Sequence, residues 1–150
     1  MTTRWINRLR VLLFLWGIIF SGALGIFVFA TDALFAQMND LSMRYTPHLA
    51  PIAYSSERFW LVLTTSLMLT LVMLCFGAAL DIKQRMNWVP LLLISKFVST
   101  ISFLAYFLTG HTSLAYVIGA LTDGFVFFLT AFIYTKANRE DGFRGHGNWL

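Results

Sequence analysis

Four long apolar runs constrain this chain more than any other feature. They cover approximately residues 11–31, 59–80, 88–109 and 113–135. Each is about 20 residues long, the length that a helix needs to cross a hydrocarbon core of roughly 30 Å. The runs are apolar on every face, whereas membrane β-strands alternate apolar and polar residues. The sequence therefore predicts one all-α integral membrane domain, with four transmembrane helices in an antiparallel bundle.

The composition agrees with a lipid environment. Of the 150 residues, 58% are hydrophobic and only 12% are charged, more apolar surface than a soluble domain of this size can bury. Basic residues beside the apolar runs give a net charge of +4. They form no stripe that follows a phosphate backbone, so we expect anionic lipid headgroups rather than nucleic acid as partners. The first run is longer than the apolar core of a signal peptide, so we expect it to be a retained anchor.

The connecting segments differ in length. Residues 32–58 are too many for a simple connection, and their mixed helical spacing of apolar residues predicts a short interfacial helix in the first external loop. That helix either caps the bundle or docks a partner or covers a ligand. Residues 110–113 form a tight turn that makes the last two helices a hairpin. Residues 136–150 are polar and predict a cytoplasmic tail.

Basic residues outside the runs predict the orientation, and tryptophans near the ends of the chain and of the runs predict the membrane interfaces. Eight Lys or Arg residues fall on the side that carries both termini, and two fall on the other side, namely Arg44 and Arg58. Because cytoplasmic segments carry the excess of basic residues, both termini are predicted to be cytoplasmic, in the inner (plasma) membrane of a bacterium. Amphipathic tryptophans favour the two membrane interfaces, so we expect Trp5, Trp60, Trp88 and Trp149 to be interfacial anchors.

Two charged residues lie inside the apolar runs, Lys96 in the third and Asp123 in the fourth. A turn centred on His111 places them about three residues out of register, or about 4.5 Å of helix rise, within reach of a lysine side chain. The spacing predicts an intramembrane ion pair. It either pins the hairpin, with Ser95, Ser99 and Thr122 providing further hydrogen bonds, or forms a proton or anion site.

Small residues mark faces where helices can approach closely. Gly17, Ser21 and Gly25 recur every four residues in the first run, and Ala120 and Gly124 do so in the fourth. We expect them to be helix-packing positions, either within this bundle or against another protein.

The sequence lacks a complete catalytic, metal or cofactor signature. Cys75 is the single cysteine, which excludes intramolecular disulfides and CxxC chemistry. None of His48, His111 and His146 lies within an apolar run, so we expect no haem held between helices, no metal and no other cofactor.

The segments FWLVLTTSLMLTLVM (59–73), LLLISKFVST (91–100) and ALTDGFVFFLTAFIY (120–134) resemble the DoxX-like group of small four-helix bacterial membrane proteins. Some members of that group are linked to quinone-dependent redox systems as small membrane subunits. The resemblance therefore implies association with a larger assembly more than it implies a reaction.

Together these features predict a non-catalytic accessory or structural subunit of a larger inner-membrane complex, in photosynthetic or respiratory energy conversion. Its expected partners are membrane lipids and other membrane protein subunits. The alternative is a small membrane protein that handles a quinone, a pigment or another lipid-soluble molecule, with Lys96 and Asp123 as the polar groups of its pocket.

Overall fold

The computed structural model describes residues 4–51, 59–110 and 112–145, and within these ranges every regular element is helical. Four helices are long: α1 (Arg4–Phe29), α3 (Phe59–Leu80), α4 (Val89–Leu108) and α5 (Leu114–Gly145). Between them lie the 15-residue helix α2 (Thr31–Tyr45) and a 3-10 turn, η1 (Met86–Trp88). In the described part of the chain, four helical segments are long and apolar enough to cross a membrane, as predicted.

The sequence predicts some ends of these helices correctly and others not. Helix α3 covers the residues of the second apolar run, and Pro90 lies in the first turn of α4, where proline is well tolerated. Helix α1 begins at Arg4 instead of residue 11, because Ile6 and Leu9 are buried and extend its packed face. Helix α5 continues to Gly145, well beyond the apolar run, with Ala137 fully buried. An apolar run therefore marks the length that suits lipid, not the full length of the helix.

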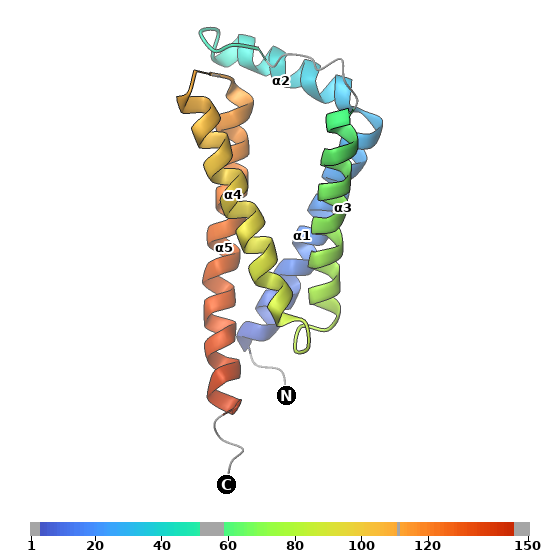
Figure 1. Ribbon diagram of the computed structural model, residues 1–150, viewed down its shortest axis with the longest axis vertical. Coiled ribbons are helices and arrows are strands. Elements are labelled where there is room, and N and C mark those ends of the chain that lie inside the picture. Colours follow the sequence, from blue (N-terminus) through green and yellow to red (C-terminus); the bar gives the residue numbers. More distant parts are fainter. Residues whose placement is uncertain (1–3, 52–58, 111, 146–150) are drawn as a thin grey trace.

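The long helices form two antiparallel pairs, α1 with α3 and α4 with α5, and α1 also packs against α5 (Figure 1). Helix α1 begins and α5 ends at the same end of the molecule, which we call the terminal end. Helix α2 lies across the opposite end, which we call the α2 end. A short helix in the first loop is thus confirmed. Figure 1 also shows that the two pairs diverge toward the α2 end.

The buried core lies in the half of the molecule near the terminal end. The buried residues of α1 all precede Ser21, and those of α3, among its side chains from Trp60 onward, all follow Leu71. Helix α4 buries Val89, Leu92 and Lys96 in its first two turns, and nothing later. The pairs are therefore joined by tight packing over half of their length only.

At the α2 end, the two pairs are connected through the chain that follows α2. The Ala50 N–H donates a hydrogen bond to the Thr112 carbonyl oxygen at 2.8 Å, which ties this segment to the turn between α4 and α5. Ser42, in the last turn of α2, is buried. At the other end of α2, Ala30 alone separates it from α1. Helix α2 thus spans from one pair to the other.

Candidate functional site

The structure brings together the two charged residues of the apolar runs. Lys96 Nζ lies 2.7 Å from Asp123 Oδ1, across the interface between α4 and α5. Both side chains are largely withdrawn from the surface, with exposed fractions of 9% for Lys96 and 16% for Asp123. A charge in so apolar a setting is costly unless it is paired and hydrogen-bonded, and this pair satisfies both conditions.

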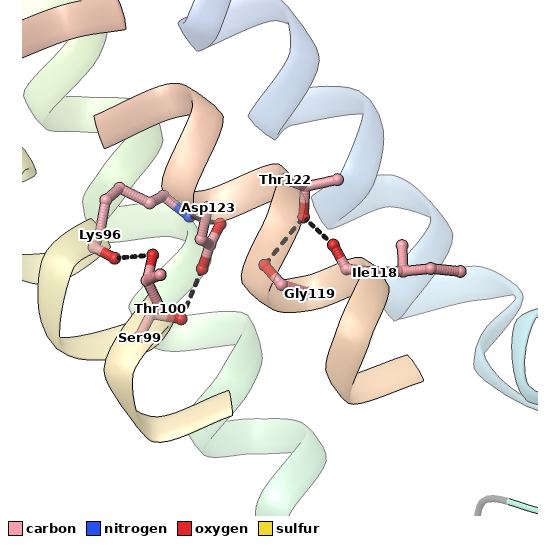
Figure 2. A network of polar contacts seen from close by, with 7 residues as sticks. All are labelled: Lys96, Ser99, Thr100, Ile118, Gly119, Thr122 and Asp123. Atoms are coloured by element: carbon pink, nitrogen blue, oxygen red, sulfur yellow. Dashed lines mark hydrogen bonds and ion pairs between the residues drawn. The ribbon is translucent and has the colours of Figure 1, made fainter. Parts of the chain in front are cut away.

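Ser99 completes the pairing of the carboxylate. Its Oγ donates to Asp123 Oδ2 at 2.5 Å, so each carboxylate oxygen has its own donor (Figure 2). Lys96 and Ser99 are three residues apart on α4 and therefore lie on the same helix face. Thr100 Oγ1 donates to the Lys96 carbonyl oxygen at 2.7 Å, a bond within α4.

Two other predicted members of this network do not join it. Thr122 Oγ1 bonds to the carbonyl oxygens of Ile118 and Gly119 in its own helix (Figure 2). Ser95 is exposed. Both residues directly precede a member of the pair, and one residue turns a helix side chain by about 100° away from its neighbour. The expectation that Ser95 and Thr122 support the pair was therefore wrong.

Helix α1 adds aromatic residues to the site. The Lys96 Nζ lies 4.6 Å from the centre of the Phe20 ring, where a cation interacts favourably with the ring face. One turn earlier, the Trp16 indole stacks on Phe20 and donates from Nε1 to Thr130 Oγ1 of α5 at 3.0 Å. Both Trp16 and Thr130 are buried.

Sequence reasoning missed these three residues, although a signal for them exists. Trp16 and Phe20 are four residues apart, and Asp123 and Thr130 are seven apart, so each pair shares one helix face. This spacing shows which residues share a face of one helix, but it does not show that the faces of α1 and α5 meet.

The small residues differ in what they face. A Cβ added to Gly17 would lie 2.8 Å from the Phe76 ring of α3, and one added to Gly124 would lie 3.5 Å from Thr100 of α4. Ala120 is also buried. In contrast, a Cβ added to Gly25 would meet nothing within 4 Å, and Ser21 is exposed. Gly17 thus lies in a close contact and Gly124 in an ordinary van der Waals contact, whereas Gly25 and Ser21 show no close contact with the described part of the chain.

Three predicted interfacial anchors lie near helix ends. Trp5 and Trp88 belong to segments at the terminal end, and Trp60 is in the first turn of α3 at the α2 end. The Trp5 N–H also donates to Glu140 Oε2 at 3.2 Å, which links the start of α1 to α5. Trp149 lies outside the described residues.

The site has the geometry of a neutral, internally satisfied contact. Among the described residues, no group of three or more His, Cys, Asp or Glu side chains could hold a metal ion. A groove of about 370 Å³ lies beside the pair, between α4 and α5, and its walls include Thr100, Ala120 and Gly124 but neither Lys96 nor Asp123. These contacts fix the positions of α1, α4 and α5 relative to one another along their axes.

Comparison of the chain with protein-family models, with curated proteins and with solved structures finds no match. The resemblance to the DoxX-like group therefore stays a prediction.

Proposed function

We propose that this multi-pass membrane protein is a non-catalytic accessory subunit of a larger bacterial inner-membrane complex. Its four long helices cross the bilayer as an antiparallel bundle, and both termini are cytoplasmic. The resemblance to DoxX-like proteins favours a complex of photosynthetic or respiratory energy conversion.

The distribution of basic residues supports this orientation. The start of α1, the turn after α3 and the end of α5 contain most of the Lys and Arg residues, and all three lie at the terminal end (Figure 1). Arg44 is in α2, at the opposite end. Cytoplasmic segments of membrane proteins have this excess of positive charge.

The observation that carries the subunit role is the closed charge pair. Each oxygen of Asp123 has a donor within the chain, and Lys96 is enclosed by Asp123 and the Phe20 ring. A group that exchanges protons or binds substrate needs an open position, whereas a structural contact is complete without one. The pair thus has the properties of a pin between helices.

The half of α1 nearer the α2 end supports the same role. Its small residues Gly22 and Gly25 have open space beside them, and Ile26, Val28 and Phe29 are exposed. In lipid, small residues allow helix backbones to approach closely. A helix of another subunit would find room at this face.

Native mass spectrometry of the protein, extracted from its own membrane in mild detergent, tests the proposal. The expected result is a complex with at least one other membrane protein in fixed stoichiometry. Detection of the whole population as a free chain of 17.1 kDa would contradict the subunit role.

The apolar groove between α4 and α5 favours a second function, the handling of a quinone or another lipid-soluble molecule. Its volume of about 370 Å³ is in the range of small-molecule sites, and it lies one helix turn from Lys96 at Thr100. Photolabelling with an azido-quinone separates the two functions. Labelling of Tyr116 or Val117 in the groove, lost when Gly124→Leu fills it, supports the second function; uniform labelling of lipid-facing residues supports the subunit role.

A further inference from the structure

A second groove lies between α1 and α3 near the terminal end, away from the charge pair. It has a volume of about 410 Å³ and is lined by Asn7, Arg10, Val11, Phe14, Ala79 and Leu80. These side chains are polar at one end of the groove and apolar at the other. From Asn7 to Phe14, seven residues of helix correspond to about 10 Å of length.

The polar end of this groove carries a free positive charge. Arg10 is exposed, and it has no ion pair or hydrogen bond within the described part of the chain. In comparison, the Arg8 guanidinium lies 4.7 Å from the Trp5 ring, and that of Arg85 lies 4.9 Å from the Trp88 ring. Arg10 is thus available to an external anion.

Nearby charges favour an anion further. The turn after α3 provides one acid, Asp81, together with Lys83 and Arg85. Asp81 already accepts a hydrogen bond from the Gln84 N–H. The local field at this end of the groove is therefore positive.

The apolar end of the groove is open to the hydrocarbon side. Val11 is 68% exposed and Leu80 is 70% exposed, and Phe14 packs edge-on against Phe76 at the base of the same interface. A flexible acyl chain fits a shallow apolar surface that is continuous with lipid, whereas a water-soluble anion gains nothing from it.

We propose that this groove binds one anionic phospholipid, with its phosphate at Arg10 and Asn7 and an acyl chain along Val11, Phe14 and Leu80. The positive rim matches the charge of the lipid, and the order of polar and apolar residues matches its shape. The site rests on the proposed orientation, which places it at the anionic cytoplasmic leaflet, but it does not depend on the accessory-subunit role.

Native mass spectrometry tests the site on the full chain in detergent micelles titrated with phosphatidylglycerol or phosphatidylcholine. We expect one phosphatidylglycerol to bind in preference to phosphatidylcholine. Arg10→Gln should weaken its binding about five-fold, as expected for one basic residue near a membrane surface. Arg4→Gln is the matched control, because Arg4 is exposed on the same helix and does not line the groove; it should leave binding unchanged.

A second pair of variants tests the apolar end. Val11→Trp fills the groove and should displace the lipid, whereas Ile18→Trp, at an exposed position outside the groove, should not. Equal weakening by Arg10→Gln and Arg4→Gln would mean diffuse attraction and would overturn the proposal. Displacement of the lipid by inorganic phosphate would also overturn the proposal. So would the formation of a dimer of this chain that is lost in Val11→Trp, because the groove would then bind a second copy of the chain.

Discussion

At the scale of single residues, Asp123 is at the centre of the interactions at the candidate site. Its carboxylate has two donors from one face of α4, and Lys96 extends past it to the Phe20 ring of α1. A lysine that contacts a carboxylate and an aromatic ring holds three helices through one side chain. The pair is therefore expected to contribute mainly to assembly of the fold.

Breaking the pair on one side should be more harmful than removing it. Lys96→Met or Asp123→Leu alone leaves an uncompensated charge away from water, so we expect a loss of about 3 kcal/mol or more in unfolding free energy. The double variant should recover much of this loss. Thermal unfolding in detergent measures both; single variants as stable as the natural chain would mean that the pair is not structural.

The residues of this site were partly predictable. Lys96, Asp123 and Ser99 follow from the hairpin register, because a tight turn fixes which residues of two neighbouring helices are level. Phe20 and Trp16 do not follow from it, because the apolar runs give no information on how α1 rotates against α5. That rotation depends on which side chains of the two helices meet, and the hydrogen bond from Trp16 to Thr130 is one such contact.

At the scale of elements, α1 has two different halves. Its first half contributes Leu9, Leu13 and Trp16 to the core, whereas its second half exposes Ile26 and Phe29. The first half contains Arg4, Arg8 and Arg10, whereas the second half has no charged residue, so hydropathy does not predict that the first half is the one that packs. The difference arises from the divergence of the helix pairs.

Two glycines of α1 provide a matched comparison of these halves. Gly17→Val places a side chain into the Phe76 ring and should destabilise the isolated protein by about 1–3 kcal/mol, as overpacking does. Gly25→Val meets open space and should leave thermal unfolding unchanged. If the second half of α1 contacts another subunit, Gly25→Val should also reduce co-purification of that partner. Equal melting temperatures for the two variants would contradict the packing described for Gly17.

At the scale of the whole molecule, the described residues form four long helices, with α1 beginning and α5 ending at one end (Figure 1). The apolar runs predict this arrangement. They do not predict the divergence of the helix pairs, since that depends on side-chain volumes near Trp16 and on the link from Ala50 to Thr112.

Reporter fusions test the proposed orientation. A phosphatase that is active only outside the cytoplasm should be inactive when fused after Leu150 and active when inserted near Asn39 of α2. The basic residues at the terminal end provide the physical reason. A green fluorescent protein fusion at Leu150, which should fluoresce, serves as the reciprocal control; the opposite pattern at both positions would reverse the topology.

The hydrogen bond from Trp16 to Thr130 joins residues that are 114 positions apart. During synthesis, α1 therefore leaves the ribosome long before its partner on α5. Until α5 follows, the indole N–H of Trp16 lacks the acceptor that it has in the folded chain, Thr130 Oγ1. The order of emergence makes α5 the helix that closes the core, so chains truncated before Thr130 should be substrates for membrane proteases.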